Sequence, residues 1–309
     1  MSRKRSTLHG VVVVDKPKGP TSHDVVARVR RALHTREVGH AGTLDPMATG
    51  VLVVAVGEAT KLVPWLTAAD KRYATTVRFG VDTDSLDAQG EILRRDEISS
   101  TLRDALDALA NGAVPKMIED ALAAERARDQ QVPPVISAIR IGGERAHELT
   151  RKGTPPDLPP RPVVVKDLVV SGGASLPEPH LQLEVEVSKG YFVRSLARDL
   201  AARLGTVGHL SDLRRTRSGA FELAHAVALD ENLLREGMVP LARAATIALP
   251  SSTLSEKGVL AARQGQRVAV TELSTPHPCP SAWLDESGML VAVGEVVEGA
   301  GRVLRGFCV

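Results

Sequence analysis

Residues 39–56 read GHAGTLDPMATGVLVVAV, and this stretch decides more about the protein than any other. Its first twelve residues contain three glycines, one proline, one histidine and a single carboxylate, Asp45. Turn residues of this kind fix a loop in a special backbone shape, which can hold a reactive side chain on a rigid scaffold. The last six residues are an aliphatic run typical of a buried strand. Asp45 is therefore a candidate reactive group, although the local pattern equally allows an Asx turn that caps the loop.

The residues on either side of this loop predict an α+β fold. Hydrophobic alternation over residues 72–79 places Tyr73, Val77 and Phe79 on one face of a strand. Thr21 and Ser22 can cap a helix whose apolar residues recur at helical spacing. We expect strands near 11–14, 51–56, 72–79 and 181–187, and helices near 22–34, 99–109 and 196–204. This pattern predicts a mixed or antiparallel sheet with flanking helices.

The domain organisation follows from changes in composition. Residues 116–130 form a charged, alanine-rich run, and residues 153–162 contain five prolines, so both are interpreted as insertions or mobile segments. A composition change near residue 248 predicts a linker. Short strands are expected beyond it, near 267–270, 289–293 and 302–307. We therefore predict a catalytic domain at 1–247, with an insertion at about 116–160, and a small β-rich module at 248–309.

Composition excludes several classes of protein. Hydrophobic residues make up 43% of the 309 residues, which excludes global disorder. The longest aliphatic runs are far too short to span a membrane, so no membrane association is expected. The two cysteines, Cys279 and Cys308, cannot form a disulfide framework or a four-ligand zinc site, and they favour a reducing, cytoplasmic location.

The charge distribution points to a polyanionic partner. The net charge is only +2, but residues 1–40 contain nine Lys or Arg and three Asp or Glu, and residues 189–217 contain seven and two. Two basic blocks on an acidic remainder favour nucleic acid as the partner. Two ordinary solvated surfaces would produce the same counts, so charge alone leaves both interpretations open.

No motif for a metal or a nucleotide cofactor is present. The nine histidines show no H-x-x-H spacing, and the chain lacks both a phosphate-binding loop and a dinucleotide fingerprint. Residues 82–90 briefly resemble a calcium loop but fail its ligand pattern, since Leu86 stands at a ligand position. We interpret them as a turn with one carboxylate directed into the site, and we expect neither metal nor cofactor.

Arg194 and Tyr73 are the other candidates that the residues themselves suggest. Arg194 falls in the first turn of a predicted helix, where the helix dipole disfavours a cation. A carboxylate such as Asp45 or Asp87 would compensate; a surface arginine that is solvated or paired with Asp199 is the alternative. Tyr73 follows two cations, so its ring could stack on an extruded base while they hold phosphates. An ordinary core tyrosine is the alternative.

Taken together, the motifs resemble bacterial tRNA pseudouridine-55 synthases over residues 10 to about 220. The loop at 39–50 resembles the signature loop of that family. The other matching segments occur in the family's order: they are VVVDKPKGPTS at 12–22, GEATK at 57–61, KRY at 71–73, residues 84–90, SA at 137–138, SKGYFVR at 188–194 and LRRT at 213–216. The sequence departs from the family at Phe192, where a tyrosine is common, so no polar role is expected for Phe192.

The resemblance implies a role for each site residue. It makes Asp45 the catalytic aspartate, with Arg194 as its partner and Asp87 as a second carboxylate competing for Arg194. It places Tyr73 beside the target uracil and Leu213 in the wall of the uracil pocket. The remaining residues that it implies in substrate binding are His40, where the target nucleotide has left the stack, and Lys61.

The resemblance also implies the function. The chain would convert uridine to pseudouridine at position 55 in the T arm of tRNA, as a monomer without an obligate protein partner, and would also assist tRNA folding. The insertion would grip RNA, and the C-terminal module would be a PUA-like RNA-binding domain. The alternatives are a synthase acting on another uridine or RNA, a non-catalytic RNA-binding protein, and a hydrolase with an aspartate nucleophile.

Overall fold

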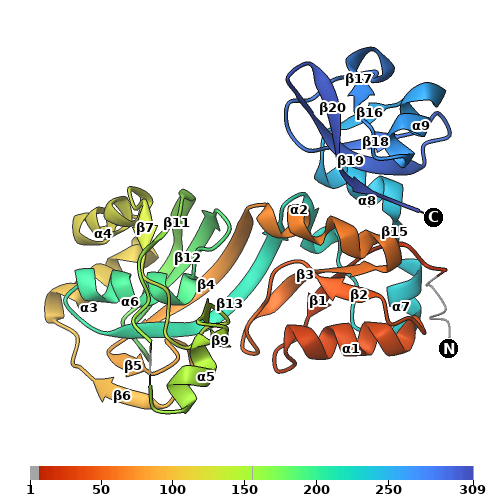
Figure 1. Ribbon diagram of the computed structural model, residues 1–309. Helices are drawn as coiled ribbons and strands as arrows, with labels where there is room; N and C mark the ends of the chain where they lie inside the picture. The colour runs from red at the N-terminus through yellow and green to blue at the C-terminus, as the bar shows by residue number, and fades with distance from the viewer. Residues whose placement is uncertain (1–6, 155, 309) are drawn as a thin grey trace. The chain divides into compact units, whose positions relative to one another are not determined.

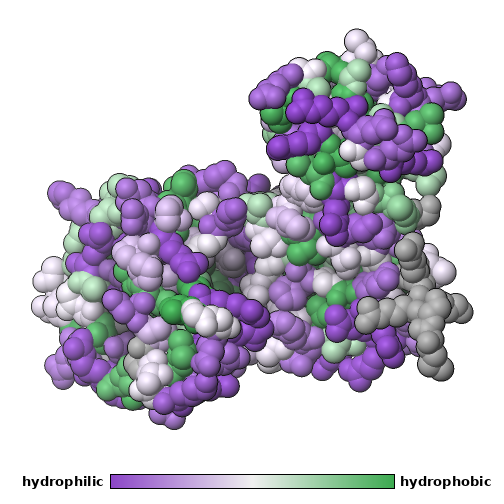
Figure 2. Space-filling model, viewed as in Figure 1, coloured by the Kyte–Doolittle hydropathy of each residue, from purple (hydrophilic) through white to green (hydrophobic). Residues whose placement is uncertain are grey.

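The computed structural model describes residues 7–154 and 156–308, which divide into two compact units (Figure 1). Of the described residues, unit 1 takes 7–45, 50–68 and 218–308, and unit 2 takes 46–49, 69–154 and 156–217. Of the first basic block, Arg3, Lys4 and Arg5 lie outside the described residues. None of the described helices has the length and hydropathy that crossing a membrane requires. Hydrophilic residues cover most of the visible surface (Figure 2).

The centre of unit 1 is a set of valine-rich strands. Here β1 (Gly10–Lys16) pairs in antiparallel fashion with β3 (Thr49–Val56), and β15 (Met238–Pro240) pairs with the other edge of β1. The short strand β2 (Val38–His40), which leads into the signature loop, pairs with β3. The four valines at 11–14 are fully buried, because these central strands have covered faces on both sides.

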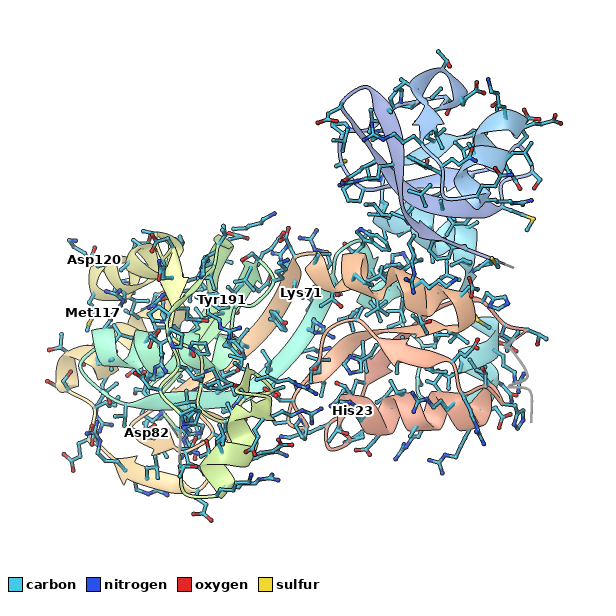
Figure 3. The ribbon with its side chains drawn as sticks, in the orientation of Figure 1. His23, Lys71, Asp82, Met117, Asp120 and Tyr191 are labelled. Carbon is cyan, nitrogen blue, oxygen red and sulfur yellow. The ribbon has the colours of Figure 1, made fainter. Side chains whose placement is uncertain are left out.

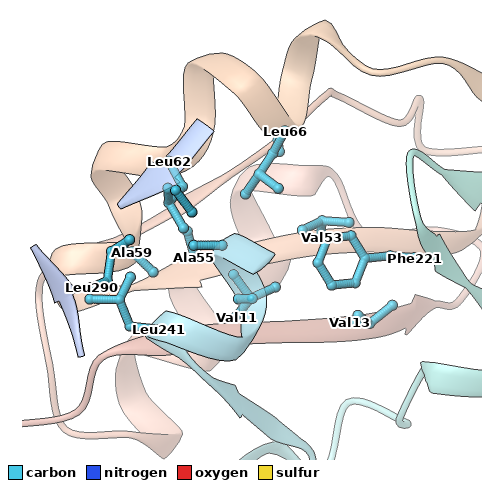
Figure 4. Close-up of a cluster of buried hydrophobic side chains, with 14 of the residues drawn as sticks. Val11, Val13, Val53, Ala55, Ala59, Leu62, Leu66, Phe221, Leu241 and Leu290 are labelled. Atoms are coloured by element: carbon cyan, nitrogen blue, oxygen red, sulfur yellow. The ribbon is translucent and has the colours of Figure 1, made fainter. Parts of the chain in front are cut away.

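The C-terminal third of the chain shares a hydrophobic core with these strands. Val11 and Val53 lie in one buried cluster with Leu241, Leu290 and Phe307. Figure 4 shows the first four of these side chains. Residues that lie more than two hundred positions apart thereby stabilise each other by removing apolar surface from water.

Beyond residue 250 the chain forms the β-rich module that the sequence predicts. Its strands follow the order β16-β18-β19-β20-β17, with β16 and β18 parallel and the other pairs antiparallel. Their bounds are β16 (Ser251–Thr253), β17 (Val268–Ala269), β18 (Ser281–Leu284), β19 (Leu290–Val297) and β20 (Ala300–Gly306). Together with the helices, this mixed sheet confirms the α+β fold class. The boundary at 247/248 stays a prediction.

Unit 2 contains the neighbouring strands β11, β12, β4 and β13, which are hydrogen-bonded in that order (Figure 1). The strands are β4 (Lys71–Phe79), β11 (Val165–Ala174), β12 (His180–Val187) and β13 (Gly208–Ser218). In β4 the side chains of Thr75, Val77 and Phe79 are buried and that of Tyr73 is half-buried. The predicted alternation is therefore confirmed, and Tyr73 lies on the same face between buried Lys71 and Thr75, opposite Val185.

Most of the segment at 116–130, which is interpreted as an insertion or a mobile segment, is helical. It forms the helix α4 (Lys116–Arg126), whose buried residues are Ile118, Ala121, Leu122 and Glu125. These positions recur at intervals of three and four, so they form one face of the helix. Three of them are small or aliphatic, and the high charge of the remaining positions hid this face. Among the described residues of the proline-rich segment, Arg161–Pro162 form the short strand β10, which pairs with β7 (Gln130–Gln131).

The remaining elements complete the two units. In unit 1 they are α1 (Ser22–Ala32), η1 (Gly57–Leu62), α2 (Val63–Ala68), β14 (Phe221–Glu222), η3 (Leu223–His225), α7 (Glu231–Glu236), α8 (Leu241–Ala248), α9 (Glu256–Arg263) and η4 (Val270–Glu272). In unit 2 they are β5 (Val81–Thr83), β6 (Ile92–Arg95), α3 (Ser100–Ala108), η2 (Leu109–Asn111), β8 (Arg140–Ile141), β9 (Glu144–Arg145), α5 (Ala146–Arg151) and α6 (Val193–Arg203).

Candidate active site

The residue before Asp45 is held by the first residue of helix α1. The hydroxyl of Ser22 accepts a hydrogen bond from the backbone N–H of Leu44 at 2.8 Å and donates one to its carbonyl oxygen at 3.0 Å. A serine hydroxyl can do both because it has one proton and two lone pairs. Ser22 is buried. Both main-chain groups of Leu44 are thereby fixed, which restricts the backbone that carries Asp45.

Replacing Ser22 by alanine should destabilise unit 1. The change leaves a buried N–H and a buried carbonyl oxygen of Leu44 without this partner, which costs about 1–3 kcal/mol in the free energy of unfolding. Ser100 is the matched control, because it is also the first residue of a helix but is exposed. Urea unfolding of Ser22→Ala and Ser100→Ala measures both effects. Equal stabilities of the two variants would contradict the role of Ser22.

The signature loop places His40 and Asp45 in unit 1, each half-buried. The ring of His40 packs edge-on against the ring of His23, with 5.4 Å between the centroids. His23 lies in the first turn of α1 (Figure 3). The loop is also tied to the sheet, since Ala41 N–H donates to the carbonyl oxygen of Val53 at 2.9 Å. Helix α1 and strand β3 therefore both hold the loop, in agreement with the rigid loop that the sequence predicts.

Lys61 has well-defined contacts with the C-terminal strand. Its ammonium donates to a carboxylate oxygen of Glu58 at 2.5 Å and to the carbonyl oxygen of Gly306 at 3.1 Å, and it lies 5.6 Å from the ring centre of Phe307. The same Glu58 oxygen accepts the backbone N–H of Cys308. These contacts give Lys61 and Glu58 a structural role at the end of β20. RNA binding by Lys61 stays a prediction.

In unit 2 the structure brings Asp87 and Arg194 together. Both side chains are about 7% exposed, and Arg194 Nε lies 3.9 Å from Asp87 Oδ2. The two terminal nitrogens of Arg194 donate to the carbonyl oxygens of Ser85, at 2.7 Å, and Ile136, at 3.0 Å. Arg194 is therefore buried and directed by several partners, and the alternative of a solvated surface arginine is wrong. Its predicted pairing with Asp45 stays a prediction.

The turn that carries Asp87 is built around that side chain. Asp87 Oδ1 accepts hydrogen bonds from the hydroxyl of Ser85 at 2.8 Å and from the N–H of Gln89 at 3.0 Å. Leu86 has a positive φ of 61°, and a Cβ at Gly90 would lie 2.3 Å from the Ser85 hydroxyl, so the turn requires glycine there. The other oxygen, Oδ2, lies nearest to Arg194. That this carboxylate points into the active site stays a prediction.

Tyr73 and Leu213 lie on two strands that side-chain bonds join. The hydroxyl of Thr75 on β4 donates to the carbonyl oxygen of Asp212 on β13 at 2.7 Å, and that of Thr216 donates to the carbonyl oxygen of Arg72 at 3.2 Å. These bonds lie on either side of Leu213, which is buried. The two bonds hold Arg72, which precedes Tyr73, and Asp212, which precedes Leu213, on adjoining strands of unit 2.

Lys71, at the start of β4, is the most strongly perturbed cation of this region (Figure 3). Burial of the ammonium and repulsion from Arg215 lower the pKa of Lys71 from 10.5 to about 8. Arg215 is itself almost completely buried. Two cations of the KRY and LRRT segments, Lys71 and Arg215, are thus buried close enough in unit 2 to repel each other.

This lowered pKa predicts how stability depends on pH. Between pH 8 and 10.5 the unfolded chain binds more protons at Lys71 than the folded chain, so this residue makes the free energy of unfolding rise with pH. Lys71→Met removes the effect. Urea unfolding at both ends of the window should show wild type gaining stability relative to Lys71→Met. A constant difference between the two proteins would contradict the lowered pKa.

In the described part of the chain, no three or more His, Cys, Asp or Glu side chains are grouped as ligands for a metal ion. The candidate residues of unit 1 are Asp45, His40 and Lys61, and those of unit 2 are Tyr73, Asp87, Arg194 and Leu213.

Two family models match adjacent parts of this chain. Residues 30–193 match the N-terminal domain of TruB family pseudouridylate synthases, and residues 194–238 match the C-terminal domain of tRNA pseudouridylate synthase B. The chain belongs to the TruB family. The matched regions contain all seven candidate residues, among them the catalytic candidate Asp45.

Curated relatives within the TruB family cover most of the chain. The tRNA pseudouridine synthase B of Thermobifida fusca (strain YX) is 40% identical over 298 residues, which are 95% of this chain and 96% of that protein. The tRNA pseudouridine synthase B of Mycolicibacterium paratuberculosis is 47% identical over 226 residues, which are 72% of each protein. A chain in the crystal structure of a Cbf5-Nop10-Gar1 complex shares the fold, with a TM-score of 0.69 and 24% identity over 97% of this chain and 84% of that one.

The residues that hold the candidates in place were not recognised from the sequence. Ser22 was interpreted only as a helix cap, and Glu125 and Gln131 fall in or next to the segment interpreted as an insertion or a mobile segment. Both Glu125 and Gln131 are buried. For Glu125 a signal existed, because it continues the spacing of Ile118, Ala121 and Leu122 along one helical face.

Proposed function

We infer that this protein is a tRNA pseudouridine synthase that converts uridine 55 in the T arm of tRNA to pseudouridine. The observation that carries the inference is its membership of the TruB family over residues 30–238. The relatives named tRNA pseudouridine synthase B that cover nearly the whole chain support the same substrate. We further propose that it acts in the cytoplasm as a monomer without an obligate protein partner.

The reaction exchanges one glycosidic bond for another. The C1′–N1 bond breaks, the uracil turns, a C1′–C5 bond forms, and the proton on C5 is lost while N1 gains one. No net oxidation or reduction takes place. We propose that Asp45 acts at the sugar, either as the nucleophile at C1′ or as the group that initiates elimination. A base must also remove the C5 proton.

The other residues bind and orient the flipped nucleotide. The half-buried ring of Tyr73 on β4 supports stacking on the uracil, and buried Leu213 supports an apolar pocket wall. Arg194 is the partner of Asp45 in this proposal, and the distance of 3.9 Å between Arg194 and Asp87 supports Asp87 as a competing carboxylate. His40 fills the place that the nucleotide leaves, and Lys61 binds the RNA backbone.

The domain assignment is part of the same proposal. Residues 1–247 form the catalytic domain, its segment at about 116–160 grips the RNA, and residues 248–309 form an RNA-binding module. The five-stranded sheet between Ser251 and Gly306 supports the last assignment.

Mapping of pseudouridine at single-nucleotide resolution tests which uridine of the tRNA is modified. Unmodified tRNA is incubated with the purified chain, and a tRNA in which uridine 55 is replaced by cytidine is the control. We expect a single product at position 55, and no product in the control. Product at another uridine would retain the chemistry and overturn the assigned position. An unchanged tRNA would overturn the function.

A further inference from the structure

Helix α6 starts without the groups that usually stabilise a helix N-terminus. Its N-cap is Phe192, whose side chain makes no capping bond, and its first turn contains no acidic residue. Arg194 is the second residue of the helix, at the positive end of the helix dipole. Another part of the chain must therefore hold the start of α6 in place.

The side chain of Gln131 supplies that support. Its Nε2 donates to the carbonyl oxygen of Phe192 at 3.1 Å, and its Oε1 accepts the N–H of Phe192 at 2.8 Å. The two bonds reproduce the pairing of two peptide groups in a sheet and fix the orientation of the Phe192 backbone. Gln131 is 2% exposed, so water does not compete for these bonds.

The residues that follow Gln131 bind the next residues of α6. The hydroxyl of Ser195 donates to the carbonyl oxygen of Val132 at 2.9 Å, and Arg194 donates to that of Ile136. The backbone of Gln131 is itself paired with Arg161 in the β7–β10 ladder. One short segment, residues 131–136, thus contacts three of the four residues from 192 to 195.

A buried ionic network holds the residues on either side of these contacts. Tyr191 donates from its hydroxyl to Glu125 Oε1 at 2.8 Å, and Arg128 donates to Glu125 Oε2 at 2.8 Å and lies 3.1 Å from Asp199. Glu125 is fully buried. Burial and the neighbouring carboxylate raise the pKa of Tyr191 well above its usual value, so this hydroxyl keeps its proton and remains a donor. Figure 3 shows Tyr191 directly before α6.

We propose that Gln131 is a positioning residue for the reaction: it sets the start of α6 and thereby the direction of the Arg194 guanidinium. The inference rests on the proposed function and adds a residue that touches neither substrate nor reacting atoms. The bond between Tyr191 and Glu125 also ties the end of α4 to the residue before Phe192. The short segment from Glu125 to Gln131 is therefore held at both ends, and it supports the start of α6.

The test compares three variants of the full chain. Gln131→Met keeps the length of the side chain but removes both bonds. Gln131→Glu keeps the acceptor for the Phe192 N–H and replaces the donor by an oxygen that faces a carbonyl oxygen. Gln130→Met is the matched control, because Gln130 is the adjacent glutamine and is exposed.

We expect both Gln131 variants to lower kcat for pseudouridine formation by on the order of ten- to a hundred-fold, since a small misplacement in an active site has effects of this size. The KM for tRNA should stay within a few-fold, and Gln130→Met should match wild type. Unchanged kcat in folded Gln131→Met and Gln131→Glu, or a loss confined to KM, would overturn the proposal.

Hydrogen exchange separates this inference from the proposed function. We expect the backbone amides of residues 191–196 to exchange about ten-fold faster in Gln131→Met than in wild type, while those of β1 and β3 are unchanged. Wild-type exchange in the variant would overturn the support by Gln131 whether or not the enzyme is active. Exchange could instead be faster in Gln131→Met while the wild-type protein makes no pseudouridine. This result would overturn the function, and with it the positioning role, but it would leave the contact between Gln131 and Phe192 intact.

Discussion

Asp45→Asn should abolish pseudouridine formation while tRNA binding stays within a few-fold of wild type. The substitution is nearly isosteric but removes the charge that the proposed chemistry at C1′ requires. We expect kcat to fall on the order of ten-thousand-fold, the scale of losses when a reacting group is removed from an enzyme. Binding should survive because it rests on phosphate contacts made by other residues.

The experiment must separate a reactive aspartate from a structural one. Asp104→Asn, on the exposed face of α3, removes the same charge elsewhere and should match wild type in both activity and binding. If Asp45→Asn lost stability and binding together with activity, Asp45 would be the turn-capping residue that its local sequence also allows. Urea unfolding and a tRNA binding assay on the same samples distinguish these results.

The affinity for tRNA should fall steeply with salt. A protein that contacts six to ten phosphates loses roughly a thousand- to a hundred-thousand-fold in affinity between about 50 and 200 mM salt. Exposed cations of the first basic block, among them Arg28 and Arg31 on α1, provide such contacts in this account. Nearly constant affinity over this range would contradict the polyanion interpretation of the charge blocks.

The slope of log affinity against log salt in the same titration tests whether the exposed face of α1 contacts phosphates. Arg28→Ser and Arg31→Ser should each reduce the slope of log affinity against log salt by about one, because each removes one phosphate contact. Arg103→Ser removes an exposed arginine outside both basic blocks and should leave the slope unchanged. Equal slopes for all three variants would move the RNA-binding surface away from α1.

Local structure was largely predictable because it depends on residues close in the sequence. The capping box of Thr21 and Asp24, the alternation of β4 and the left-handed glycine after α6 all act within a few residues. The strand β18 was missed, because its four residues are too short to show a period. Helix α4 was misjudged because its charged outer face dominates its composition.

The contacts that position the candidate residues were not predictable, because they join distant residues. Ser22 and Leu44 are 22 positions apart, and Gln131 and Phe192 are 61 apart. The charge count also overstated the second basic block. Arg194 and Arg215 are buried, and others of its arginines pair with carboxylates, such as Arg217 with Glu186. A count of charges cannot distinguish a solvated arginine from one that holds the fold together.

The central claim is that this chain rearranges uridine in tRNA, and loss of the C5 proton reports this most directly. Unmodified tRNA labelled with tritium at C5 of its uridines is incubated with an excess of the wild-type protein. The account predicts release of the tritium of one uridine per tRNA. No release, in a sample where the tRNA is bound, would contradict the account and favour a protein that only binds or folds RNA.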